Sequence, residues 1–148
     1  MLCWAPMVAL LGVVTLPVNH HHQTNMNGVQ VEVQSCVTGF GVYATALSSE
    51  LYTGGIQYGY PVRLSESVTL IGQAYVGASY PSHWVPELPN QLQFDTGARL
   101  VARWHHAVLE LAWQHDSNAG LGRTVWQGRR WYGNTGLDLM KFGIGWEF

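Results

Sequence analysis

The feature that most constrains how this chain folds is an alternation of apolar and polar side chains, strongest between residues 92 and 115. Leu, Phe, Ala and Trp dominate the even positions of 92–104, whereas Gln, Asp and Arg occupy most odd ones. Successive side chains of a β-strand point to opposite faces, so a period of two predicts a strand. Applied along the chain, the period predicts strands at 29–35, 37–47, 51–60, 67–79, 92–104, 106–115 and 137–148.

These seven strands suggest a closed barrel with one strand still to be found, because bacterial membrane barrels have an even number of strands. The eighth is expected from a division of residues 28–48 or from a segment near 123–132. The predicted fold class is therefore all-β, a small antiparallel transmembrane β-barrel of eight strands.

The period does not show which face of a strand points into the barrel and which points outward. Six charged side chains of the later strands lie opposite the apolar face. In a soluble barrel that polar face meets water, whereas in a membrane barrel it lines a filled interior and the apolar face meets lipid. The charged positions concerned are Asp95, Arg99, Arg103, Glu110, Lys141 and Glu147.

Several features favour the membrane barrel. The expected strands are long enough to cross a bilayer when tilted, which takes about 9–11 residues. Short connections at 63–66 and 104–106 alternate with long ones at 81–90 and 120–134, as in outer-membrane barrels. Charged residues make up only 11% of the chain, against about 25% in average soluble domains. Aromatic residues mark strand ends, where interfacial girdles lie, at Trp104, Trp113, Trp146 and the terminal Phe148.

The first 18 residues contain an apolar core that is too short to span a bilayer as a helix, which needs about 20 residues. They predict a secretory signal, with a boundary up to about residue 27, followed by a barrel domain over 28–148. His20, His21 and His22 are expected to be a polar spacer, with no metal site.

The two cysteines do not predict a disulfide framework. Cys3 lies in the expected leader, so Cys36 is expected to be a lone thiol that packs as a small residue. The net charge of −2 excludes the basic surface that nucleic-acid binding requires.

The segment WQHDSNAG, residues 113–120, carries the candidate chemistry. His115 and Ser117 continue the outward parity of Trp113, and residues two apart on a strand lie about 6–7 Å apart. A serine becomes nucleophilic when a base takes its proton, and the base needs an acceptor that fixes its tautomer.

Asp138 is the candidate acceptor, because it is the only carboxylate on the apolar face of the last strand. The two strands follow one another across one loop, so Asp138 is expected level with His115. Asn118 is a candidate donor to an oxyanion. The alternative is a strand end with ordinary Asn-Ala-Gly turn chemistry.

The strings HDSNAG (115–120) and NTGLD (134–138) resemble the lipid A 3-O-deacylase (PagL) family of small outer-membrane barrels. That family has an H-x-S-N-A-G motif followed by N-x-G-x-E at the start of its final strand. The resemblance implies that His115 and Ser117 are catalytic, that Asn118 forms the oxyanion hole and that Asp138 is the acid. It covers the last third of the chain. Here the acid is an aspartate instead of the usual glutamate, and the connection between the motifs is longer.

The resemblance implies a carboxylic ester hydrolase that removes a 3-hydroxyacyl chain from lipid A or lipopolysaccharide in the bacterial outer membrane, without metal or cofactor. Arg123, Arg129 and Arg130 are predicted to contact the lipid A phosphates, because arginine matches phosphate geometry. The alternative for them is a solvated loop with aromatics at the membrane interface.

Two other functions stay open. One is a non-catalytic outer-membrane barrel, either an adhesin or a structural protein, in which the motif has no chemical role. The other is a soluble β-barrel that binds an apolar ligand, with its apolar faces, His115 and Ser117 turned inward. The expected partners are lipopolysaccharide and outer-membrane lipid, and a homodimer is left open.

Overall fold

The computed structural model describes residues 6–18, 25–48, 51–82, 92–117, 124–126, 129–131 and 136–148. No helix among these residues has the length and apolarity needed to cross a membrane. The strands are β1 (Met7–Pro17), β2 (Met26–Gln34), β3 (Phe40–Leu47), β4 (Leu51–Arg63), β5 (Val68–Pro81), β6 (Gln93–Trp104), β7 (Ala107–Ser117), β8 (Thr124–Trp126), β9 (Arg129–Trp131) and β10 (Leu137–Glu147).

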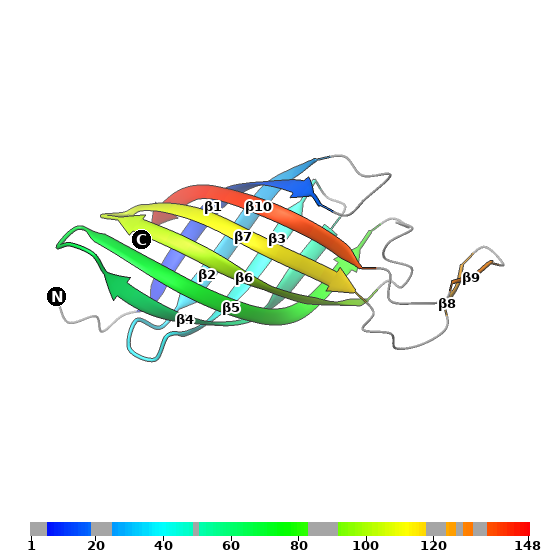
Figure 1. Cartoon of the computed structure of the whole chain (residues 1–148), viewed down its shortest axis with the longest axis horizontal. Helices are drawn as coiled ribbons and strands as arrows, with labels where there is room; N and C mark the ends of the chain where they lie inside the picture. Colours follow the sequence, from blue (N-terminus) through cyan, green and yellow to red (C-terminus); the bar gives the residue numbers. More distant parts are fainter. Residues whose placement is uncertain are drawn as a thin grey trace.

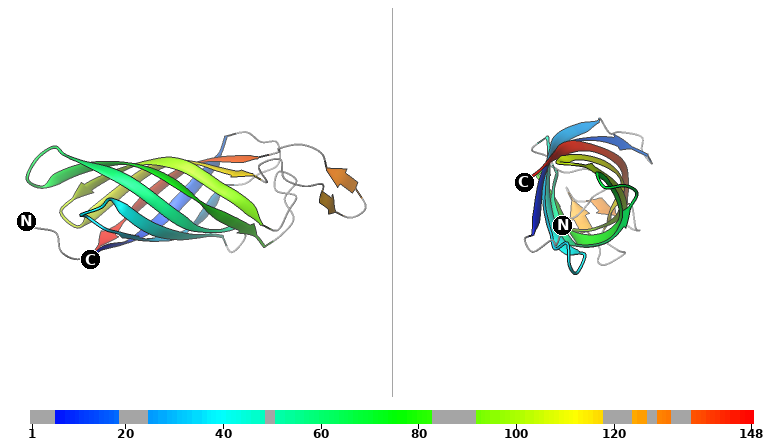
Figure 2. Two further views of the ribbon diagram at one scale, coloured as in Figure 1. Left: turned by 90° about the horizontal axis from the view of Figure 1, so that it is seen from below. Right: turned by 90° about the vertical axis from the view of Figure 1, so that its left-hand side faces the viewer.

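Eight strands close into one antiparallel barrel in the order β1-β10-β7-β6-β5-β4-β3-β2 (Figures 1 and 2), which confirms the predicted fold class. β8 and β9 form a separate two-stranded sheet. The connections 35–39, 64–67 and 105–106 lie at the end of the barrel that also holds the C-terminus (Figure 1), which we call the turn end. At the opposite end, which we call the loop end, β5 and β7 end and β6 and β10 begin.

The eighth barrel strand is β1, which corrects the sequence-based interpretation of the first 18 residues. Residues 7–17 pair with β2 on one side and with β10 on the other, so they form part of the barrel wall. The barrel therefore begins before residue 28. Neither a division of 28–48 nor the segment near 123–132 supplies the missing strand.

The misleading feature of β1 is that both of its faces are apolar apart from Thr15 on the lumen side. Leu11 and Val13 point inward and are buried, whereas Leu10 and Val14 point outward and are exposed. An inward face of aliphatic side chains removes the polar half of the alternation. The strand then has the same uninterrupted apolar run as a signal sequence.

The expectation of a lone thiol is also wrong. Cys36 lies in the connection between β2 and β3 and is disulfide-bonded. The expectation rested on losing Cys3 with a leader. Cys3 itself, like the predicted spacer of His20, His21 and His22, lies outside the described residues.

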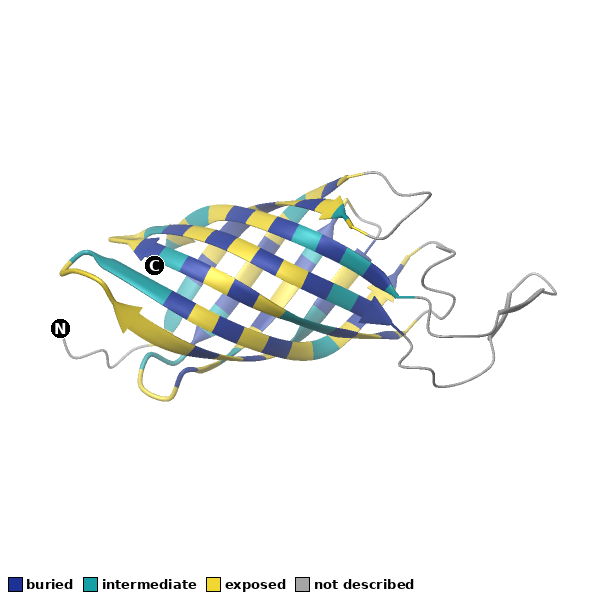
Figure 3. Ribbon diagram, in the orientation of Figure 1, coloured by how far each residue is buried: buried dark blue, intermediate teal, exposed yellow. Residues whose placement is uncertain are grey.

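The barrel wall is apolar outside and polar inside, so buried and exposed residues alternate along each strand (Figure 3). Ile144 on β10 is 68% exposed, whereas Lys141, a lumen residue of the same strand, is 0% exposed. This polarity is that of a membrane barrel, in which lipid solvates the outer face and side chains fill the lumen. A soluble barrel would have its apolar faces inside, so the alternative of an inward-facing apolar ligand cavity is contradicted.

A charged cluster fills the middle of the lumen. The Arg99 guanidinium packs against two aromatic rings, 4.5 Å from the Tyr43 centroid and 4.2 Å from the Tyr75 centroid. It forms an ion pair with Glu32, and its Nη1 lies 3.9 Å from Glu110 Oε2. Buried charges are costly unless they are paired, so these contacts allow the strands to close around them.

Lys141 completes the cluster from β10. Its Nζ lies 3.4 Å from Glu110 Oε1 and donates a 2.5 Å hydrogen bond to Gln30 Oε1. The chain's single lysine is thereby paired although it is fully buried.

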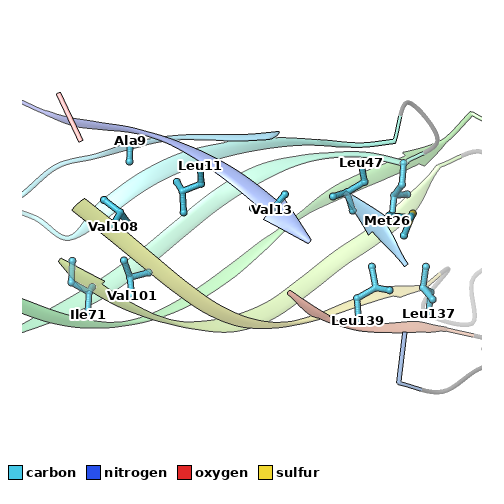
Figure 4. Close-up of a cluster of buried hydrophobic side chains, with 11 residues drawn as sticks. Ala9, Leu11, Val13, Met26, Leu47, Ile71, Val101, Val108, Leu137 and Leu139 are labelled. Atoms are coloured by element: carbon cyan, nitrogen blue, oxygen red, sulfur yellow. The ribbon is translucent and has the colours of Figure 1, made fainter. Parts of the chain in front are cut away.

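Buried apolar side chains also lie inside the barrel (Figure 4). Ile71, Val101 and Val108 pack near the turn end, and Met26, Leu47, Leu137 and Leu139 pack near the loop end. Leu137 and Leu139 are 1% and 0% exposed. Because both of these side chains point inward, the side chain of Asp138, which lies between them in the sequence, points outward.

Removal of β1 tests the corrected strand assignment. Deletion of residues 1–17 should prevent the refolded protein from closing, because β2 and β10 would be left with unpaired backbone groups in an apolar environment. We expect the truncated chain to lose the heat-modifiable electrophoretic band of a folded barrel, whereas the full chain retains it. A truncated chain that refolds with the full chain's circular dichroism would show that 7–17 is dispensable.

Candidate active site

The predicted catalytic residues lie where β7 ends and β10 begins, at the loop end of the barrel (Figure 1). β7 and β10 are hydrogen-bonded neighbours, and their register places Asp138 directly opposite His115. Both residues have outward parity, whereas Gln114 and Asp116 on β7 point into the lumen and are 0% exposed. The register therefore forms a polar pair on an otherwise apolar outer wall.

The pair is in direct contact. His115 Nδ1 lies 2.8 Å from Asp138 Oδ1, and the two side chains are 27% and 23% exposed. Donation from Nδ1–H to the carboxylate leaves Nε2 with the lone pair that a general base requires. The aspartate is long enough because it lies directly across the ladder, where Cβ atoms are about 4.5–5.5 Å apart.

Three neighbours of His115 were not among the predicted site residues. The Trp113 ring stacks on the imidazole with a centroid distance of 6.0 Å and an interplanar angle of 24°. Thr96 on β6 is the cross-strand partner of His115. Gly136 lies against the ring, because a Cβ at that position would overlap His115 Cε1.

Two of these neighbours left a signal in the sequence. Thr96 is the polar interruption in the outward series of 92–104, and Trp113 has the outward parity of His115. The close approach of Gly136 carried no such signal, because it depends on how the ring lies on β10.

Ser117 is the last residue of β7 and follows His115 by two positions, so both residues belong to the same face of the strand. Its cross-strand partner is Phe94 on β6, and its exposure is 5%. The sequence predicted a lipid-facing serine, and the structure shows one that is well covered.

The structure does not describe the side chains of the four other predicted site residues, so their positions relative to the His115–Asp138 pair stay a prediction. Asn118 and Arg123 lie outside the described residues, and Arg129 and Arg130 are described only as backbone of β9. In the described part of the chain, no group of three or more His, Cys, Asp and Glu side chains has an arrangement suited to a metal ion. The site therefore consists of an oriented imidazole, its acid and a serine on one strand face.

Comparison with known proteins finds solved structures that cover nearly the whole chain at low identity. No protein-family model matches the chain, and no curated protein does. The crystal structure of the outer membrane enzyme PagL is 14% identical, with 95% of this chain and 98% of that chain covered and a TM-score of 0.48. The Yersinia pestis outer membrane protein Ail in a phospholipid bilayer nanodisc is 12% identical, with 97% and 99% covered and a TM-score of 0.45.

A crystal structure of Ail, the attachment invasion locus protein of Yersinia pestis, is 11% identical, with 97% of each chain covered and a TM-score of 0.45. Identities this low concern the fold alone, and one fold can carry unrelated functions. They do not distinguish an enzyme from a non-enzymatic barrel.

The contact between Gly136 and the imidazole can be tested by substitution. Gly136→Ala should push the His115 ring away from its position on Asp138, because the added Cβ would lie 2.9 Å from Nε2 and closer still to Cε1. We expect a shifted Cε1–H resonance for His115, assigned by its loss in His115→Gln. Gly72→Ala is the matched control, since a Cβ there meets nothing within 4 Å. An unchanged resonance in Gly136→Ala would contradict the contact.

Proposed function

We propose that the chain is an outer-membrane esterase that removes an ester-linked 3-hydroxyacyl chain from lipid A. Its location is supported by the polarity of the wall, with large apolar side chains outside and charged ones inside. The strands of 11–14 residues from β4 to β7 and at β10 are long enough to cross a bilayer when tilted, since about 9–11 residues suffice.

The observation that carries the proposal is the 2.8 Å contact between His115 Nδ1 and Asp138 Oδ1. Ser117 follows His115 by two residues on the same face of β7. A carboxylate on a lipid-facing wall is costly unless it is paired. The pair also provides what a serine hydrolase needs, an imidazole fixed in one tautomer by an acid.

In the proposed reaction, Ser117 Oγ attacks the carbonyl carbon of the ester while His115 Nε2 takes the serine proton. The resulting tetrahedral oxyanion collapses, the bond to the sugar oxygen breaks, and His115 returns the proton to that oxygen. Water then attacks the acyl-serine ester with the same base, which frees the fatty acid and restores Ser117. Asp138 stabilises the imidazolium, and we assign Asn118 to the oxyanion.

The substrate class follows from where the site opens. His115 and Asp138 belong to the outer wall, so an acyl chain reaches them laterally from the bilayer without passing through the lumen. Trp113, 45% exposed and stacked on His115, offers an apolar surface beside the reacting atoms. In this proposal Arg123, Arg129 and Arg130 contact the lipid A phosphates.

A second candidate is a non-catalytic barrel, and the burial of Ser117 favours it. A serine that is 5% exposed presents little surface to a substrate. In that case the His115–Asp138 pair would only satisfy two polar groups on the wall.

Replacement of the proposed nucleophile separates the two candidates. Purified protein in detergent should release 3-hydroxy fatty acid from lipopolysaccharide, and Ser117→Ala should abolish the release while the barrel stays folded. Ser67→Ala, in the short β4–β5 connection at the turn end, is the matched control and should retain full activity. Mass spectrometry of the lipid A product measures both. Unchanged release by Ser117→Ala would contradict the mechanism, and absence of release by all variants would favour the non-catalytic barrel.

A further inference from the structure

Two carboxylates lie inside the barrel directly behind the candidate active site. Asp95 on β6 and Asp116 on β7 are cross-strand partners, and both are 0% exposed. Asp116 stands between His115 and Ser117 in the sequence, so its side chain points into the lumen from the strand that carries them. Side chains of directly opposed residues are close, with Cβ atoms about 4.5–5.5 Å apart.

Each carboxylate has one satisfied oxygen and one that lacks a partner. The Tyr43 hydroxyl donates a 2.6 Å hydrogen bond to Asp95 Oδ2, and Gln114 Nε2 donates a 2.8 Å hydrogen bond to Asp116 Oδ2. Within the described strands, neither Asp95 Oδ1 nor Asp116 Oδ1 has a hydrogen-bond partner. Buried polar atoms in folded proteins almost always have one, so these two oxygens require an explanation.

Gln114 gives an independent sign of a ligand. Its side chain is fully buried and directed at Asp116 by its amide nitrogen, yet its carbonyl Oε1 has no hydrogen-bond partner among the described residues. Ser79 on β5 and Thr53 on β4 are buried cross-strand partners, and their hydroxyls also have no hydrogen-bond partner among the described residues. The side chains that converge here thus present oxygen from four strands.

The charges of the lumen balance everywhere except at this place. The described ion pairs join Arg99 and Lys141 to Glu32 and Glu110 in the middle of the lumen, and Arg103 to Glu147 near the turn end. None of them includes Asp95 or Asp116. Two buried carboxylates therefore face each other without a cationic side chain in ion-pair contact, which is unfavourable unless a proton or a cation compensates them.

We propose that Asp95, Asp116 and the Gln114 carbonyl bind one calcium ion in the lumen, with the Ser79 and Thr53 hydroxyls as further donors. An all-oxygen set suits a hard cation, and two carboxylates match a divalent charge. Calcium accepts mixed carboxylate, amide and hydroxyl ligands in flexible geometry, whereas magnesium demands a near-ideal octahedron and keeps several waters. The ion holds the loop end of β7 against β6, on the opposite side of the wall from His115.

Calcium binding is measured on the full-length protein, refolded in detergent with either EDTA or calcium chloride and then desalted. We expect about one calcium per chain by elemental mass spectrometry after refolding with calcium, and a higher midpoint of thermal unfolding than in EDTA. Asp116→Asn and Asp95→Asn should each lose both the bound calcium and the shift. Glu147→Gln, a lumen acid at the turn end, is the matched control and should keep both.

The outcomes are distinguishable even if one variant fails to fold, because calcium binding by the unaltered protein is itself a test. No bound calcium in the refolded protein would overturn the proposal. The proposal is also overturned if calcium changes the thermal stability of neither the unaltered protein nor the Asn variants, and if all are equally stable in EDTA. A proton shared by the two carboxyls would then compensate the charge. Equal binding by Asp116→Asn and the unaltered protein would place the ion elsewhere.

Discussion

Closure of the barrel through the pairing of β1 with β10 is the constraint on which the rest of the structure depends. A chain whose outer surface is apolar cannot leave strand edges unpaired, because lipid offers no hydrogen bonds to backbone groups. Nine residue pairs, from Ala9 with Glu147 to Pro17 with Leu139, make up this junction. They fix the position of β10 and, through it, the register that brings Asp138 to His115.

The interior gives the second requirement, which is charge compensation in a closed space. Arg99 on β6 packs against Tyr43 and Tyr75 and is paired with Glu32, so one side chain connects strands β2, β3, β5 and β6. The same two-residue period that fills the lumen with polar groups leaves the outer wall apolar. On β7, two adjacent residues therefore face opposite sides of the wall. His115 faces outward with Asp138, and Asp116 faces inward with Asp95.

The sequence was most informative where the two faces of a strand differ in polarity. The strands from Val68 to Trp104 and from Ala107 to Ser117 were predictable because Arg, Asp and Gln alternate there with Leu, Ala and Trp. The contact of His115 with Asp138 followed from parity and chain order, which define the register of consecutive antiparallel strands.

Strand β1 was not predictable because its lumen positions Leu11 and Val13 are as apolar as its outer ones. A period of two can be detected only where the two faces of a strand differ in polarity. The pairing of Asp95 with Asp116 was also missed. Both residues were recognised as polar-face positions or motif members, but only the closed sheet shows that they oppose each other. The approach of Gly136 to the imidazole depends on a ring orientation that no sequence pattern records.

The central claim is that His115 and Asp138 make Ser117 a nucleophile on the outer wall. It is tested most directly by treating the folded protein with a long-chain alkyl fluorophosphonate, which phosphonylates an activated serine, and by mapping the adduct with peptide mass spectrometry. The account predicts a single adduct on the peptide that contains Ser117, formed far more slowly in Asp138→Asn. No adduct at Ser117, or one formed at the same rate in Asp138→Asn, would contradict it.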